Sequence, residues 1–319
     1  DKITKKDGKE ISSDDLLEEM AKSIYQSGEP GLVFIDRLND DNQVPSTGEY
    51  KTLAPCGEVG LVEGETCQFS YINLGKFINK GEVNYSELED AVRASVRLLD
   101  DAVDYNISKY ADDLSKDVAG KRRKVGLGVC GFADMLNQLE INYSSPEARN
   151  IAEDVFSFIN YISKEQSVEL AKERGSFGSF VGSKYTTEES IIKKYAERET
   201  GKVSSEMWLK LDKKIKKYGI RNCATISIPP TSRSSLIIGA SPSIEPHFYD
   251  MLGVLPEDQV LMIESIQKFV DESISKTVNM PEASSIEDIK KIILMSINSN
   301  LKGITIYRDK SRKAQPEKI

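Results

Sequence analysis

The 319-residue sequence has little of the residues on which several common classes of protein depend. It has one histidine, His247, and four cysteines, no two of which are separated by two residues. A histidine-rich metal site, a zinc knuckle and a disulfide scaffold are therefore excluded as the basis of its chemistry. We expect any chemistry to come from thiols, carboxylates or a cofactor held mainly by backbone, and we expect no metal ligands.

Long apolar runs and an excess of positive charge are also missing. The longest purely apolar runs have four or five residues, and the first residues lack the apolar stretch of a secretory signal. The chain has 43 Lys+Arg against 51 Asp+Glu, a formal charge of −8, with no basic stripe. We therefore expect no membrane, no duplex nucleic acid as a partner, and a cytoplasmic location.

Helix and strand patterns alternate along the chain. Serine caps and apolar spacing predict helices that begin after Ser12, Ser86 and Ser145, and further helices over residues 186–199, 204–218, 257–276 and 285–300. Apolar runs predict strands over residues 31–36, 50–53, 124–130, 221–228 and 303–307. This alternation predicts a single parallel α/β domain over residues 1–319, with a frayed tail at 313–319. Five strands are too few to close a barrel, so the sheet stays open or another chain completes it.

One segment combines a thiol and a carboxylate on a stiff loop. In Ala54-Pro55-Cys56-Gly57-Glu58 the cysteine stands two residues before the glutamate, between a proline and a glycine that restrict the turn. Such a loop can aim both groups at one substrate carbon, although a plain surface turn is the alternative interpretation. Cys67, eleven residues beyond Cys56, is by itself typical of a small buried apolar cysteine.

A second segment is rich in hydroxyls and follows a predicted strand. Its members are Pro230, Thr231, Ser232, Arg233, Ser234 and Ser235. Hydroxyls and backbone N–H groups at the start of a helix, with an arginine beside them, can bind an anion such as a phosphate. An ordinary Ser/Thr helix cap is the alternative.

Together these segments resemble ribonucleotide reductase. Matching motifs occur in family order from about residue 15 to residue 312, and they lie at residues 31–39, 55–58, 67–75, 126–134, 173–175, 221–222, 230–232, 244–246, 275–279 and 302–309. Where class I enzymes end in paired tyrosines, this chain has Ile306-Tyr307-Arg308, and the glycyl-radical signature of class III is absent from the sequence. The resemblance is therefore to the adenosylcobalamin-dependent class II type.

The resemblance implies a fold and a role for each matching residue. It implies the second five-stranded half of a ten-stranded α/β barrel, with a central finger loop that carries the radical cysteine. Cys56 matches the thiyl-radical cysteine, Glu58 the carboxylate that takes the 3′-hydroxyl proton, and Cys67 one of two cysteines that supply electrons. The segment from Pro230 to Ser235 matches the loop that holds the substrate phosphates. Ala54 stands where the family has an asparagine that contacts the sugar, which puts full activity in question.

The resemblance also implies partners and leaves alternatives. The expected function is reduction of ribonucleotides to deoxyribonucleotides, with an N-terminal-half reductase chain and an external dithiol such as thioredoxin as partners. One alternative is an impaired reductase-like subunit that binds nucleotide or a partner reductase. Another is a radical enzyme that acts on a different phosphorylated sugar. Cys130 and Cys223, within apolar strands, are interpreted as structural.

Overall fold

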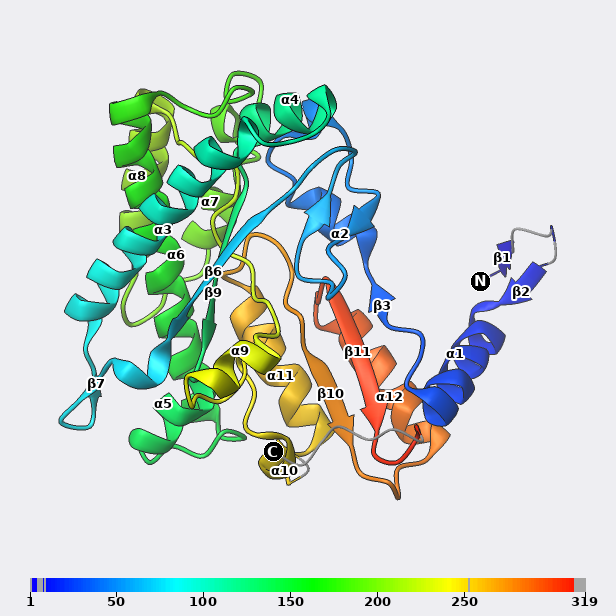
Figure 1. Ribbon diagram of the computed structural model, residues 1–319. Helices are drawn as coiled ribbons and strands as arrows, with labels where there is room; N and C mark the ends of the chain where they lie inside the picture. Colours follow the sequence, from blue (N-terminus) through cyan, green and yellow to red (C-terminus); the bar gives the residue numbers. More distant parts are fainter. Residues whose placement is uncertain (1, 5–7, 9, 252, 313–319) are drawn as a thin grey trace.

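Two pairs of parallel strands form the framework of the computed structural model, which describes residues 2–4, 8, 10–251 and 253–312 (Figure 1). Strand β6 (Gln68–Asn73) pairs with β9 (Val125–Cys130), and β10 (Thr277–Met280) pairs with β11 (Gly303–Arg308). The extended segment 221–228 joins the two pairs, because Leu127 bridges Ile226 and Ile228 bridges Ile274, both in parallel. Five parallel segments therefore lie side by side in sequence order, as expected for a half-barrel.

Three of the five segments that were predicted as strands belong to this sheet, and the other two do not. Residues 124–130 and 303–307 are strands and 221–228 is extended, as predicted. Residues 31–36 were predicted as a buried strand, and this prediction is wrong: β3 (Leu32–Val33) is a short antiparallel partner of β11, and helix α2 (Ile35–Asp40) begins directly after it. Residues 50–53 contribute only β4 (Thr52–Leu53), which belongs to a hairpin. Strands β6 and β10 supply the two remaining places.

Helices cover the sheet in two groups (Figure 1). Helix α3 (Tyr85–Ile107) packs on β6 and β9 and against α6 (Pro146–Arg174), while α11 (Pro256–Gln267), α12 (Ile286–Asn298) and α1 (Ser13–Ser27) lie beside β10 and β11. The remaining helices are α4 (Asp113–Arg122), α5 (Phe132–Gln138), α7 (Ile191–Ala196), α8 (Ser205–Tyr218), α9 (Ser232–Ile237) and α10 (Phe248–Met251). Single 3₁₀ turns occur at Pro45–Thr47, Leu74–Lys76 and Lys184–Thr186, and two further hairpins pair β1 (Lys2–Thr4) with β2 (Glu10–Ser12) and β7 (Ile78–Asn79) with β8 (Glu82–Val83).

The core lies between the sheet and these helices. All six residues of β9 are buried, as expected of a central strand that is covered on both faces. Trp208 of α8 is fully buried and makes edge contact with Tyr161. The predicted frayed tail, residues 313–319, lies outside the described residues.

Two kinds of feature are not found in the part of the chain that the structure describes. None of its helices combines the length and the apolar character needed to cross a membrane. No three His, Cys, Asp or Glu side chains of the described residues come together as a group that could hold a metal ion.

Candidate active site

A short hairpin carries the thiol and the carboxylate that the sequence singles out. Strands β4 (Thr52–Leu53) and β5 (Gly60–Leu61) pair antiparallel, and residues 54–59 form the turn between them. The Ala54 N–H donates to the Val59 carbonyl at 2.9 Å, and the Gly57 N–H donates to the Ala54 carbonyl at 2.8 Å. Gly57 has φ +84°, a conformation that favours glycine. We call residues 52–61 the finger.

The two reactive groups of the finger lie in different environments. Cys56 is exposed, whereas Glu58 is 6% exposed and its Oε2 has no hydrogen-bond partner. Although Cys56 is exposed, partial desolvation of its sulfur raises the pKa of the thiol, and the nearby Glu58 carboxylate raises it further. Burial also raises the pKa of Glu58. Cys56 is therefore held as S–H, the form that can exchange a hydrogen atom, and Glu58 is a stronger proton acceptor than an ordinary carboxylate.

A pocket of about 490 Å³ opens beside Cys56. It is lined by the finger turn, by the approach to β10 at Ile274, Ser275 and Lys276, and by the start of β11. Its size falls within the range of small-molecule sites. The lining does not include Glu58, Cys67 or residues 230–235, so of the predicted site residues the pocket brings together only Cys56 and Ala54.

Most hydroxyl groups of the hydroxyl-rich turn, residues 230–235, form hydrogen bonds to nearby backbone groups of the same chain. Thr231 has φ +50°, and its Oγ1 accepts the N–H of Ser243 at 2.7 Å. The hydroxyls of Ser234 and Ser235 donate to the carbonyls of Thr231 and Ser232, at 2.9 and 3.1 Å. Helix α9 is only six residues long. Ser232 and Arg233 are exposed, and they are the polar side chains of this turn that face solvent.

Cys67 directly precedes β6, and it does not line the pocket beside Cys56. Its thiol lies 3.7 Å from the Gln68 carbonyl oxygen. Burial raises the pKa of this thiol well above its ordinary value, although the Lys124 ammonium acts in the opposite direction. Cys130 and Cys223 are fully buried in or beside the central strands, as their structural interpretation requires.

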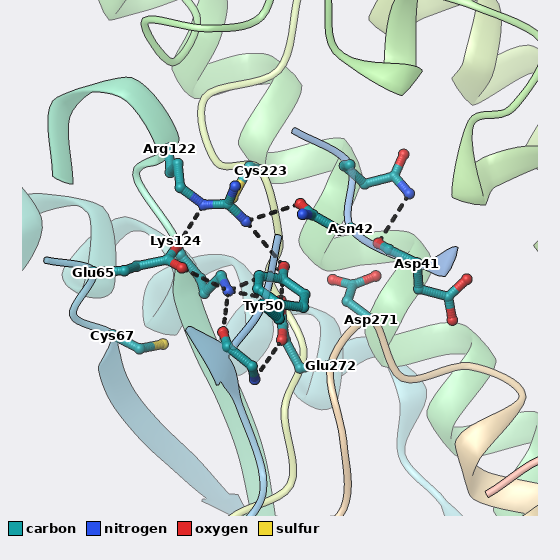
Figure 2. A network of polar contacts seen from close by, with 12 residues as sticks. Asp41, Asn42, Tyr50, Glu65, Cys67, Arg122, Lys124, Cys223, Asp271 and Glu272 are labelled. Carbon is teal, nitrogen blue, oxygen red and sulfur yellow. Dashed lines mark hydrogen bonds and ion pairs between the residues drawn. The ribbon is translucent and has the colours of Figure 1, made fainter. Parts of the chain in front are cut away.

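A buried set of charges under the finger was not anticipated from the sequence. Figure 2 shows Glu65, Arg122, Lys124 and Glu272 gathered around Tyr50, with Cys67 at the margin. Burial lowers the pKa of Lys124, but the Glu272 and Glu65 carboxylates more than offset this and raise it. These residues are dispersed over more than 200 positions, and no local pattern connects them. A lysine directly before an apolar strand is the one sequence signal that could have found the set.

Comparison with known proteins defines the class to which this fold and finger belong. A family model described as "Ribonucleotide reductase, barrel domain" matches residues 1–254 and 247–307. The chain therefore belongs to the ribonucleotide reductase family.

Individual proteins that are similar to this chain bear names of the same family. The chain is 32% identical to a vitamin B12-dependent ribonucleoside-diphosphate reductase of Thermoplasma acidophilum over 98% of its own length and 44% of the relative. It is 28% identical to the protein of that name from Mycobacterium tuberculosis, over 94% of this chain and 47% of the relative. It is also 28% identical to a ribonucleoside-diphosphate reductase subunit alpha of Chlamydia muridarum, over 89% of this chain and 27% of the relative. The chain thus spans less than half the length of these curated relatives.

Proposed function

We propose that this chain forms the catalytic half of a class II-type ribonucleotide reductase, which reduces ribonucleoside di- or triphosphates to deoxyribonucleotides. One observation carries the proposal. In this chain, which belongs to the family, the finger presents an exposed Cys56 close to a buried Glu58. Hydrogen-atom transfer requires a sulfur that is accessible and protonated. General-base chemistry requires a carboxylate whose pKa is raised toward neutrality.

The proposed roles follow the positions on the finger. Cys56, as a thiyl radical, takes the hydrogen atom from the 3′ carbon of the ribose and later returns it. Glu58 accepts the proton of the 3′ hydroxyl, which assists loss of water from the 2′ carbon. Cys67 and a second cysteine outside this chain supply two electrons and release two protons as a disulfide forms between them. Residues from Pro230 to Ser235 hold the substrate phosphates, with the exposed Arg233 as the charged group.

The cofactor proposed for this chain is adenosylcobalamin, a form of vitamin B12, and the names of two relatives state that those proteins depend on vitamin B12. The exposed thiol on an open pocket fits such a group, because a reactive sulfur must be reached from outside the protein. Ser275, which lines the pocket and is partly exposed, would face it. When bound, adenosylcobalamin supplies the radical that initiates the reaction.

Two partners are part of the proposal. Strand β6 pairs with β9 on one side, and within residues 10–251 and 253–312 no strand pairs with its other edge. We propose that an N-terminal half of the barrel, carried by a partner chain, covers this edge and supplies the second redox cysteine. An external dithiol such as thioredoxin regenerates the cysteines, which places the enzyme in the reducing cytoplasm.

Ala54 supports one competing function. Its methyl group lines the pocket beside Cys56 and can form no hydrogen bond to a sugar. This favours, as the second candidate, an impaired reductase-like subunit that binds nucleotide or a partner reductase chain.

A reconstitution experiment separates the two candidates. The chain is combined with an N-terminal half, adenosylcobalamin, dithiothreitol and a ribonucleotide, and deoxynucleotide is measured by chromatography. We expect product from the wild-type chain, and Ala54→Asn should increase the rate by about tenfold to hundredfold, which corresponds to one recovered hydrogen bond. No product from either chain, while an intact reductase works under the same conditions, would contradict catalysis and favour the binding subunit.

A further inference from the structure

The base of the finger is held at one residue, Gly60, by two buried charges. The Gly60 N–H donates to Glu272 Oε2 at 3.0 Å, and the Lys124 ammonium donates to the Gly60 carbonyl at 2.6 Å. Lys124 and Glu272 also pair with each other at 3.1 Å, with side chains 0% and 3% exposed. Both backbone polar groups of a finger residue are thus bound by one ion pair.

Tyr50, which lies just before β4, also contacts the Lys124–Glu272 ion pair. Its hydroxyl donates to Glu272 Oε1 at 2.9 Å and accepts from Lys124 at 3.1 Å. A Cβ atom at Gly60 would lie 2.6 Å from the Tyr50 ring, so only glycine allows the ring to pack so closely. Tyr50 therefore packs directly on Gly60 while its hydroxyl binds both members of the ion pair.

The two charges that hold Gly60 are themselves fixed to the sheet. Lys124 directly precedes β9, and Lys302 donates to the backbone carbonyl of Glu272 at 2.9 Å. The next residue, Ser273, donates its N–H to the Glu58 carbonyl at 2.9 Å. The turn that carries Cys56 is thereby connected to the sheet at two backbone positions, Glu58 and Gly60, both of which follow the cysteine.

The remaining charges of the set, Arg122 and Glu65, form a second pair that is linked to the first, because the Lys124 ammonium also donates to Glu65 Oε2 at 3.3 Å. Arg122 donates to Glu65 at 2.6 Å, and Glu65 accepts the Val62 N–H at 3.0 Å. The four charged side chains balance as two cations and two anions. The Lys124–Glu272 pair can therefore be removed without leaving a net buried charge.

We propose that Lys124 and Glu272 are positioning residues that fix the finger, and with it the Cys56 sulfur and the Glu58 carboxylate, at one height above the sheet. Their importance for catalysis rests on the function proposed above. Their effect on the finger does not, because it follows from the hydrogen bonds to Gly60 alone. Both side chains are buried, and both reach the finger through the backbone of Gly60, so their role is one of positioning.

The experiment removes both charges together, in Lys124→Met/Glu272→Met. Replacing a whole buried ion pair with apolar side chains is commonly tolerated, whereas removing one partner leaves the other charge uncompensated. Hydrogen–deuterium exchange of the segment 50–62 is measured by mass spectrometry in the full chain. We expect exchange there to become about tenfold faster, since the Gly60 amide and carbonyl lose their partners and must open to water.

The matched control removes another ion pair. Arg93 and Glu165, at 2.7 Å, join α3 to α6 and make no contact with the finger. In Arg93→Met/Glu165→Met, exchange of residues 50–62 should equal that of the wild-type chain. Tyr50→Phe is the milder test, which deletes one hydroxyl and leaves every charge paired. It should also make hydrogen–deuterium exchange of residues 50–62 faster, but by less than the double variant does. If the double variant does not fold, the exchange rate of Tyr50→Phe tests whether this set of contacts holds the finger.

Kinetics distinguish positioning from a merely structural role. In the reconstituted enzyme the double variant should lower kcat by about 100-fold and leave KM within about twofold, because a displaced thiol affects the reaction more than substrate binding. Unchanged finger exchange, or faster finger exchange with unchanged kcat, would overturn the inference. If the wild-type chain forms no product, the proposed function fails, and the exchange data still decide whether this pair holds the finger.

Discussion

Replacing Glu58 with glutamine is expected to stabilise the fold at neutral pH and to leave its stability unchanged in acid. Glu58 is buried, its Oε2 has no hydrogen-bond partner, and burial raises its pKa. The folded chain therefore binds a proton at this carboxyl more tightly than the unfolded chain does. The resulting stability is fully present below the unfolded pKa and is lost as the pH rises through the raised folded pKa.

The size of the effect follows from the unpaired oxygen. An unsatisfied buried polar atom costs about 1–3 kcal/mol, and more when it is charged. Glutamine removes the charge but keeps a buried polar group, so we expect it to recover only about 1 kcal/mol at pH 7.5. For a chain of 319 residues that corresponds to an increase in Tm of about 1.5 °C.

Thermal denaturation monitored by circular dichroism tests this expectation at pH 7.5 and near pH 4. Glu58→Gln should melt above the wild-type chain at pH 7.5 and together with it near pH 4. Glu63→Gln, a change of the same kind at an exposed glutamate nearby, serves as the control and should shift neither melt. A lower Tm for Glu58→Gln at pH 7.5, or a gain that persists at pH 4, would refute the reasoning.

Three further outcomes follow from the same contacts. Cys56→Ser should change the free energy of unfolding by less than about 0.5 kcal/mol in urea denaturation, because the sulfur is exposed, and a larger loss would place it in the core. Asp100→Asn should cost about 3–5 kcal/mol in the same assay, since Asp100 is fully buried between Arg123 and Arg221; a loss below about 1 kcal/mol would show that the pairs contribute little. At pH 8, iodoacetamide should modify Cys56 at least about tenfold faster than Cys223, whose pKa burial raises to about 11, and peptide mass spectrometry showing the reverse order would contradict the described exposures.

Several helix ends were predictable because their signals are local, whereas the helices predicted over residues 186–199 and 257–276 are shorter in the structure, Ile191–Ala196 and Pro256–Gln267. Ser12 and Ser145 accept N–H groups of the first turn, Gly28 takes the left-handed conformation after α1, and α6 begins at Pro146 as predicted. The predicted cap of α3 at Ser86 was wrong, because the side chain of Asn84, two residues earlier, accepts the first-turn N–H of Glu87 instead. Caps depend on residues three or four positions apart, and the sequence displays these directly.

Strands and the charges under the finger depend on distant residues. Residues 31–36 are apolar, but they lie at the edge of the sheet, where Val33 is 42% exposed and the chain turns into α2. Strand β6 contains three polar residues, Gln68, Ser70 and Asn73, and is partly exposed, so its sequence did not resemble that of a core strand. The finger was recognised from its motif, whereas the ion pair that holds it joins positions 124 and 272 and is visible only in three dimensions.

The central claim, that the Cys56 sulfur removes the 3′ hydrogen of a ribonucleotide, is tested most directly with a 3′-deuterated substrate. The reconstituted chain should form deoxynucleotide more slowly from this substrate than from the unlabelled one, and the product should retain deuterium at the 3′ carbon. Cys56→Ser should form none. Deoxynucleotide produced by Cys56→Ser at the wild-type rate would contradict the account.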